Sequence, residues 1–232
     1  MDAHELPAGR AQPDHLNRRR IRITFARGEN VRYVGHLDMA RTWERIVRRA
    51  GLPMAYSEGF NPRPRLAFAA ALPVGCTSDQ EALDVILSEP REPAEIRDCL
   101  NQAAPAGITV LDVAEVPYSA PALQTQTRAA EFVVTLLDPI SPEDARERVQ
   151  ALMNAEHIER TRRDKTYDLR PLILGMSVEV SETGQVQVGM MLKAEESGTG
   201  RPDEVVAALG MDAAAVRIHR RRLIFAQDFG SL

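Results

Sequence analysis

The order of predicted helices and strands repeats along the chain, and this repeat is what most limits its fold. RIRITFAR (20–27) alternates apolar and polar residues, which predicts a half-buried strand. The segments that follow are a helix over 36–50, a strand near 65–71, a strand over 81–89, a helix over 93–107 and a strand over 108–116. The order strand-helix-strand-strand-helix-strand is typical of a ferredoxin-like domain.

The same order returns in the second half. AEFVVTLLD predicts a strand, and a helix over 141–155 follows, with Ser141 as its cap. LILGMSVEVS and GQVQVGMMLK predict two strands, a short helix covers 201–210, and AAVRIHRRRLIFAQ predicts the closing strand. The fold class is therefore α+β, with two tandem ferredoxin-like (βαββαβ) domains.

The predicted domain boundaries follow from composition. A polar, Pro-containing flexible tail covers 1–19, the first domain covers 20–116, a linker rich in Pro, Ser and Gln covers 117–129, and the second domain covers 130–232. Paired ferredoxin-like domains occur in the RAMP-type RNA-binding and RNA-processing proteins of CRISPR systems. That likeness is one of overall architecture and does not define a function.

The formal net charge of −4 hides an uneven distribution of charge. Residues 10–65 hold thirteen arginines, no lysine and five acidic residues, a local formal charge of +8. The remainder of the chain is acidic. A basic end on an acidic protein indicates an anionic partner at that end. The alternative is a solvated basic face whose charges have partners within the chain.

Several classes of protein do not fit the sequence. No apolar run approaches the roughly 20 residues of a membrane span, and the first 20 residues lack the apolar core of a signal peptide, so we expect a cytoplasmic protein. Cys76 and Cys99 cannot form a disulfide framework or a four-thiolate site, and we expect no metal. Each cysteine is interpreted as a small buried hydrophobe.

The helix over 36–50 has an apolar face and a basic face. The apolar positions are Leu37, Ala40, Trp43, Val47 and Ala50, with Met39 and Ile46 beside them. Gly35 is the predicted N-cap, and the Asp38 carboxylate is placed to reach back toward it. The basic positions are Arg41, Arg45, Arg48 and Arg49, which fall on one stripe. Such a stripe can bind phosphates, or it can be a solvated surface.

The segment YSEGFNPRPR (56–65) predicts a rigid loop. Gly59 permits a sharp turn, and the prolines at 62 and 64 restrict the backbone. The residues that project from the loop are Phe60, Asn61, Arg63 and Arg65. An aromatic ring next to arginines suits RNA, where the ring stacks on a base and the arginines contact phosphates. The alternative is that Tyr56 and Phe60 anchor the loop to the core.

A second basic segment, TRRDKTYDLRP (161–171), could extend this surface through Arg162, Arg163, Lys165 and Arg170. Its alternative is a polar edge strand whose charges discourage pairing with other chains. Catalytic motifs such as a P-loop, HExxH or paired CxxC are missing from the sequence. The weak catalytic candidates are His36 with Asp38 and Lys165 with Asp168, which could act as acid–base pairs only if folding brings them together.

The motifs of residues 31–87 resemble the signature of the radical-SAM-linked protein family. The matching stretches are GHLD, RRAG, YSEGFNPRPR and LPVG, and KTYDLRPLI and GTGRPDEVVAALG in the second half resemble it too. This family is a domain of unknown function encoded beside, or fused to, a radical SAM protein. Gly35 replaces the usual Ser and Arg63 the usual His. The second change weakens any metal or acid–base role at that position.

The resemblance implies a radical SAM protein as partner. The iron–sulfur cluster and S-adenosylmethionine are expected on that partner, because this chain lacks a three-cysteine cluster motif. Combined with the basic segments, it suggests a non-catalytic adaptor that presents tRNA or rRNA to the partner. Two alternatives stay open, namely a docking module that does not touch RNA and an RNA-processing nuclease.

Overall fold

The computed structural model describes residues 17–58 and 60–228. The first half contains β1 (Arg19–Arg27), η1 (Glu29–Val31), α1 (His36–Arg49), β2 (Leu66–Phe68), β3 (Cys76–Leu87), α2 (Pro93–Ala103) and β4 (Ile108–Val116). The second contains α3 (Leu123–Gln126), β5 (Thr127–Leu136), α4 (Pro142–Asn154), β6 (Glu159–Arg162), β7 (Lys165–Asp168), η2 (Arg170–Leu172), β8 (Ile173–Val180), β9 (Val186–Glu195), β10 (Gly198–Thr199), α5 (Pro202–Ala208), η3 (Ala213–Ala215) and β11 (Val216–Phe225). The protein is thus a mixed α+β structure.

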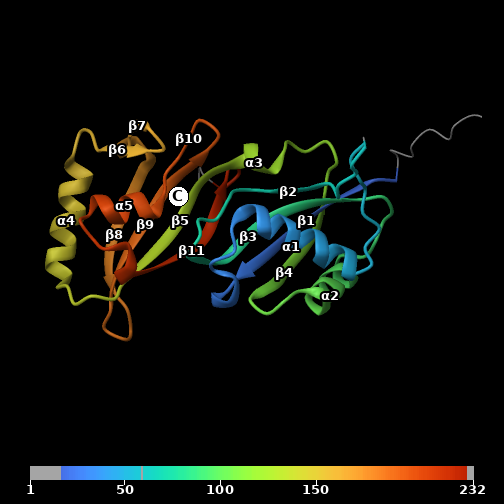
Figure 1. Ribbon diagram of the computed structural model, residues 1–232, viewed down its shortest axis with the longest axis horizontal. Coiled ribbons are helices and arrows are strands. Elements are labelled where there is room, and N and C mark those ends of the chain that lie inside the picture. Colours follow the sequence, from blue (N-terminus) through green and yellow to red (C-terminus); the bar gives the residue numbers. More distant parts are fainter. Residues whose placement is uncertain (1–16, 59, 229–232) are drawn as a thin grey trace, which may run out of the picture.

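One nine-stranded, mostly antiparallel sheet runs through both halves (Figure 1). Its order is β10-β9-β5-β11-β3-β1-β4, with β2 paired to β3 and β8 paired to β9. The strands of the first half therefore lie in the order β4-β1-β3-β2, and those of the second in the order β11-β5-β9-β8. The halves meet where β11 pairs in parallel with β3, from Ile218 opposite Cys76 to Arg220 opposite Ser78.

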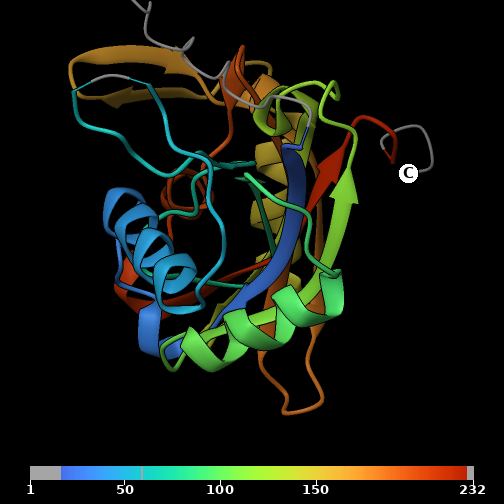
Figure 2. The same cartoon turned by 90° about the vertical axis from the view of Figure 1, so that its right-hand side faces the viewer.

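Each half has its own apolar core. In the first, α1 packs Trp43 against Phe25 of β1, with ring centroids 4.7 Å apart in an edge-on arrangement. In the second, α4 packs against β8 and β9, and Val149 of α4 and Val205 of α5 lie in the same cluster as Val188 of β9. Figure 2 shows α1 and α2 beside β1.

The helix ends follow local chemistry. Gly35 caps α1 as predicted, and Gly51, with a φ of 64°, follows its C-terminus in a conformation that glycine adopts easily. Helix α4 begins with the Ser141 hydroxyl accepting a hydrogen bond from the Asp144 N–H at 3.0 Å. The Asp38 carboxylate accepts instead from the Arg41 guanidinium at 2.9 Å, so its predicted contact with the cap does not form.

The structure corrects two local expectations. Strand β3 starts at Cys76, five residues before the predicted start at 81, because its first residues pair with β11. Leu37 was expected on the apolar face of α1, yet 74% of its surface is exposed. The buried residues of α1 are Met39, Trp43, Ile46 and Val47, and Leu37 falls outside this stripe of the helix.

Part of the N-terminal positive charge is buried. Arg20 donates to Asp84 at 2.7 Å and Arg22 donates to the same carboxylate at 2.9 Å. Arg27 is 3% exposed and donates to the carbonyls of Val31 and Val34. These arginines hold the fold together, so the charge asymmetry of the sequence overstates the basic surface.

The predicted linker contains α3, and β5 begins at Thr127. Arg20 also donates to the carbonyl oxygens of Ala120 and Pro121, which ties this segment to β1. Residues 1–16 of the predicted tail lie outside the described part of the chain. Among the helices that the structure describes, none has the length and hydrophobicity needed to span a bilayer.

Candidate nucleic-acid interface

The arginine stripe of α1 is solvent-exposed along its whole length. Arg41 pairs with Asp38 at 2.9 Å, and both side chains are largely exposed. Arg45, Arg48 and Arg49 have no hydrogen-bond or ion-pair partner among the residues that the structure describes. Within the described part of the chain, these three guanidinium groups therefore lack the internal partners that the alternative requires. Their donors are available to an external anion.

The loop after α1 is closed at its base and exposed at its tip. The Ser57 N–H donates to the Arg63 carbonyl at 2.9 Å, and the Arg63 N–H donates to the Ser57 hydroxyl at 3.0 Å. Between these contacts the Phe60 ring is fully exposed, so it projects from the loop as predicted, and the alternative that it anchors the loop is wrong. Tyr56 is 45% exposed. The predicted turn residue Gly59 lies outside the described residues.

The remaining predicted loop residues divide into two groups. Asn61 and Arg63 are exposed beside Phe60. Arg65 is half-buried, and its N–H donates to the Ala55 carbonyl at 2.9 Å. It lines a different pocket, with Tyr118 and Arg20, under the linker. Arg65 therefore lies away from the α1 stripe.

The second basic segment forms a separate two-stranded hairpin, β6–β7, with Arg162 opposite Lys165. The turn residues Arg163 and Asp164 have φ values of 47° and 62°, so a left-handed turn presents Arg163. Arg162 and Arg163 are exposed and have no partner within 17–58 and 60–228. Arg170 is different, because it donates to the carbonyls of Met153 and Ile173 and supports the hairpin base.

The structure does not bring together the weak catalytic candidates. The His36 ring lies edge-on to Phe68, 5.3 Å between centroids, while Asp38 pairs with Arg41. Lys165 is exposed beside Arg162. Asp168 instead accepts from the Ile158 N–H at 2.9 Å and from the Arg170 N–H at 3.0 Å.

The surroundings of Asp168 indicate a structural role. The hydrogen bond from the Ile158 N–H, with those from His157 and the Arg170 N–H, lowers the pKa of the Asp168 carboxyl to about 2. It therefore stays ionised and closes the base of the hairpin. Among the described residues no group of three or more His, Cys, Asp or Glu is placed to hold a metal ion.

A cleft between the two halves links His36 to the hairpin arginines. Its walls include His36, the 69–74 loop, Arg162, Arg163 and the β9–β10 turn, and its volume is about 580 Å³. The sequence contains no signal for this cleft, because its walls come from separate segments of both halves, from His36 to Arg220. We refer to it as the central cleft.

The three exposed basic elements lie on one side of the molecule. In Figure 2, α1, the loop after it (cyan) and the β6–β7 hairpin (gold) all lie to the left of the sheet. In Figure 1 the loop and the hairpin both rise along the upper edge, toward opposite ends. The central cleft lies between α1 and the hairpin.

The sequence also gave no signal for a polar cluster where β3 meets β11. The Thr77 hydroxyl lies 2.8 Å from His219 Nδ1, and Asp79 lies 3.0 Å from His219 Nε2. These contacts cross the strand pair that joins the halves. Thr77, Asp79 and His219 match no sequence motif, and the parallel pairing of β3 with β11 brings them together.

These features define a mixed α+β protein with an exposed, arginine-bearing surface. The chain belongs to the family described as "Uncharacterized protein conserved in bacteria (DUF2344)", whose pattern matches residues 20–202. No curated protein matches the sequence. The expected link between this family and radical SAM proteins stays a prediction.

Several solved structures have related chain traces. The chain is similar to one in a Cbf5–Nop10–Gar1 complex (10% identity, TM-score 0.46, 96% of this chain and 55% of that chain). It is also similar to one in an H/ACA RNP bound to a substrate RNA containing 2'-deoxyuridine (11%, 0.41, 90% and 47%) and to a putative glycine cleavage system transcriptional repressor (12%, 0.25, 90% and 98%). It spans about half the length of the first two chains.

Proposed function

We propose that this protein is a non-catalytic RNA-binding adaptor that works with a radical SAM enzyme in the cytoplasm, in tRNA or rRNA modification. The observation that carries the RNA part is the unpaired arginine surface of α1 next to the exposed Phe60 and Arg63. The radical SAM part rests on the resemblance of the sequence motifs.

The chemistry of this surface matches single-stranded or looped RNA. Guanidinium groups bind phosphates through two parallel hydrogen bonds, and a ring that stacks on a base stabilises the complex by about 1–3 kcal/mol. Burying a Phe side chain stabilises a fold by about 1.5–3 kcal/mol, and the Phe60 ring forgoes this because it is fully exposed. A loop pinned at its base and carrying such a ring is organised for a contact outside the chain.

We also infer that the two halves are ferredoxin-like units arranged as in RAMP-type proteins. The support is the strand order. Each half places its first and third strands at the centre and its second and fourth at the edges, with antiparallel pairing throughout. Each half also alternates helices with strands in the expected sequence.

A second candidate function, protein docking without RNA, has its own observation. Tyr33, Leu37 and Val74 are 71%, 74% and 61% exposed, respectively. The Gly75 N–H donates to the Arg32 carbonyl at 2.9 Å, which holds the Val74 loop beside the start of α1. Exposed apolar side chains gathered in this way are typical of protein contacts.

RNA binding as a function of salt tests the first candidate. The wild type and an Arg45→Glu, Arg63→Glu double variant are titrated with a tRNA and rRNA-fragment pool between low and moderate salt. Each lost phosphate contact lowers the slope of log K against log salt by about 0.7 for single strands, so the double variant should lose about 1.4. Affinity should fall at every salt concentration.

The matched control is an Arg97→Glu, Arg146→Glu double variant. These arginines are exposed on α2 and α4, and the change in net charge is the same. The control should keep wild-type binding. Equal losses in both variants would mean that only net charge matters, and no binding of the wild type at low salt would refute the RNA part of the proposal.

The radical SAM partner is tested separately by co-purification. A tagged copy of the chain is expressed with a radical SAM protein from the same genome, and the complex is measured by size exclusion. Binding that survives Arg45→Glu, Arg63→Glu but is lost in Leu37→Asp, Val74→Asp would assign the partner to the apolar patch. If Leu37→Asp, Val74→Asp abolishes binding of the radical SAM protein and the wild type has no affinity for RNA, the docking module is the function instead.

A further inference from the structure

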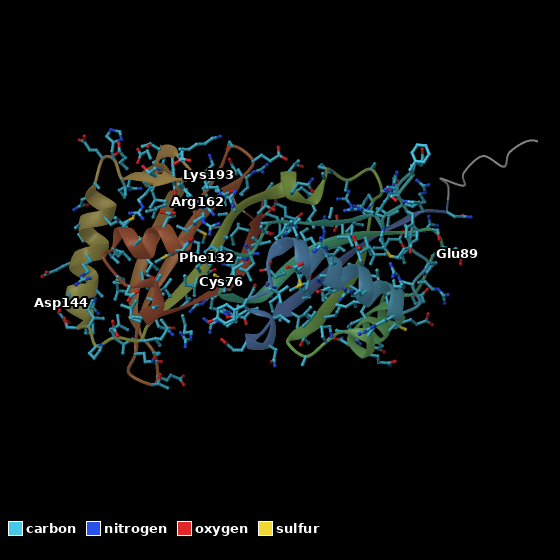
Figure 3. The ribbon with its side chains drawn as sticks, in the orientation of Figure 1. Cys76, Glu89, Phe132, Asp144, Arg162 and Lys193 are labelled. Carbon is cyan, nitrogen blue, oxygen red and sulfur yellow. The ribbon has the colours of Figure 1, made fainter. Side chains whose placement is uncertain are left out.

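The central cleft combines an apolar interior with a basic rim. Its interior includes the 69–72 backbone and side chains, Ala130 and Phe132 of β5, and Ala194 of β9. Ala69, Leu72 and Ala130 are buried, so the floor is part of the packed core. Figure 3 shows Arg162 above Phe132, near the middle of the long axis.

The charges around the cleft are unequally satisfied. Arg220 contacts Glu81 through two nitrogens and donates to the Ala71 carbonyl at 3.2 Å, so its donors are used. Arg201 pairs with Asp203 at 2.9 Å. The Glu195 carboxylate accepts from Lys193 and Ser197, and the bond from Lys193 is the main reason that its pKa is lowered. The charged side chains of the cleft without a partner among the described residues are then Arg162, Arg163 and Glu196.

We propose that the central cleft binds one unstacked nucleotide of the RNA, with its base in the apolar interior and its phosphate on Arg162 and Arg163. This inference rests on the proposed function, and it adds the chemical class of ligand and a second binding site. Glu196 and Thr199 lie at the rim and offer acceptors for base N–H groups.

The dimensions fit such a ligand. Sites for small molecules have volumes of about 300–1,000 Å³, and the cleft has about 580 Å³. An apolar interior takes a base face without leaving polar groups unsatisfied. Two guanidinium groups on one rim suit a phosphate, which accepts several charge-assisted hydrogen bonds. Taking a base out of a stack costs a few kcal/mol, and an already single-stranded loop has the smallest cost.

The position of the cleft agrees with the path of RNA across the surface. His36 begins α1 and also lines the cleft, so the first turn of the helix that carries the arginine stripe borders the cleft. The hairpin arginines lie on the other side. An RNA strand bound along α1 can therefore place one nucleotide into the cleft without a sharp bend away from the surface.

Binding of mononucleotides tests the inference without RNA. AMP, GMP, CMP and UMP, the four nucleosides and inorganic phosphate are titrated against the full chain, followed by NMR or calorimetry. Mononucleotides should bind more tightly than either the nucleoside or phosphate alone. An Arg162→Ala, Arg163→Ala variant should bind them at least about tenfold more weakly. The Arg97→Ala, Arg146→Ala control should bind as the wild type does.

A second variant, Ala70→Phe, fills the cleft and keeps both arginines. It should lose mononucleotide binding while its thermal melt stays cooperative. Because this residue is half-buried, the variant could misfold, and the exposed arginine pair then still decides the question. Equal mononucleotide binding by the wild type and the Arg162→Ala, Arg163→Ala variant would overturn the inference.

The outcomes separate this inference from the proposed function. The Arg45→Glu, Arg63→Glu variant should lose RNA affinity yet keep mononucleotide binding, because those residues lie outside the cleft. RNA binding through α1 with no mononucleotide binding would refute the cleft as a nucleotide site and leave the RNA-binding role intact. Mononucleotide binding by a chain that does not bind RNA would refute the proposed function and leave a small-molecule site.

Discussion

Removing one partner of the buried Glu81–Arg220 ion pair should destabilise the whole protein. The two side chains are 3% and 2% exposed, and Arg220 Nε donates to Glu81 Oε1 at 2.8 Å. Glu81 belongs to the first half and Arg220 to the second, so the pair lies across the junction. Loss of one partner from a buried ion pair costs about 3–5 kcal/mol, because the other charge stays buried without compensation.

The surroundings of the pair predict different losses of stability for the single variants Glu81→Gln and Arg220→Met. The negative charge of Glu81 also acts on Arg27. Burial lowers the pKa of the Arg27 guanidinium, and the Glu81 carboxylate offsets part of that decrease. Glu81→Gln therefore leaves two buried guanidinium groups without a counter-charge, whereas Arg220→Met leaves the carboxylate next to Arg27. Glu81→Gln should cost about 3–5 kcal/mol, and Arg220→Met at least about 1 kcal/mol less. The double variant Glu81→Leu, Arg220→Met should cost less than the sum of the single changes.

Urea denaturation at neutral pH measures these differences. The free energy of unfolding is compared for the wild type, the three variants and Arg146→Ala, which removes an exposed pair with Glu143 and should cost at most about 0.5 kcal/mol. If Glu81→Gln costs no more than Arg146→Ala, the pair does not stabilise the junction. A larger cost for Arg220→Met than for Glu81→Gln would contradict the role assigned to Arg27.

Three further predictions concern individual groups. The folded pKa of Asp168 is about 2, below its ordinary value of 3.8, so the stabilising effect of its carboxylate should be present above about pH 4 and disappear as the pH falls toward 2. Amide exchange at Ile158 and Arg170 should quicken over that range. In Asp168→Asn, exchange at both amides, corrected for the intrinsic rate, should be fast and nearly independent of pH. Ser141→Ala removes the cap of α4 and should lower the free energy of unfolding by about 1 kcal/mol, while a urea midpoint equal to that of the wild type would contradict this. Burial raises the pKa of the Cys76 thiol to about 11, whereas Cys99 is half-buried. A thiol reagent at pH 8 should therefore label Cys99 first and Cys76 only on unfolding, as measured by mass spectrometry. Early labelling of Cys76 would be inconsistent with the packed junction.

Local patterns were sufficient to predict most helices and strands. The strand over 108–116 and the starts of both longest helices agree with the structure, because alternation, helical spacing and caps act over a few residues. The beginning of β3 could not be predicted. Residues 76–80 are mostly polar and resemble a loop, and they become a strand because β11, about 140 residues later, pairs with them.

The candidate site shows the same division. Exposure of the α1 arginines was predictable from helical spacing. The sequence could not separate these arginines from Arg20 and Arg27, whose charges are buried, because their acceptors are distant residues or backbone carbonyls. The sequence also could not decide whether Phe60 projects or anchors the loop, since an aromatic residue in a loop often finds a core contact, and the structure shows that it projects. The central cleft depends on the packing of the two halves.

The parallel pairing of β11 with β3 also determines the order of events during synthesis. β11 lies between β5 and β3, yet it leaves the ribosome after every other strand of this sheet. Until β11 is synthesised, residues 76–78 of β3 have no strand paired at this edge, and Glu81 has Arg27 but not Arg220 as a nearby positive charge. The first half therefore emerges as an incomplete intermediate with an unpaired strand, which is the kind of surface that chaperones bind and that aggregates. A chain truncated before residue 216 would lack β11 and could not complete its sheet.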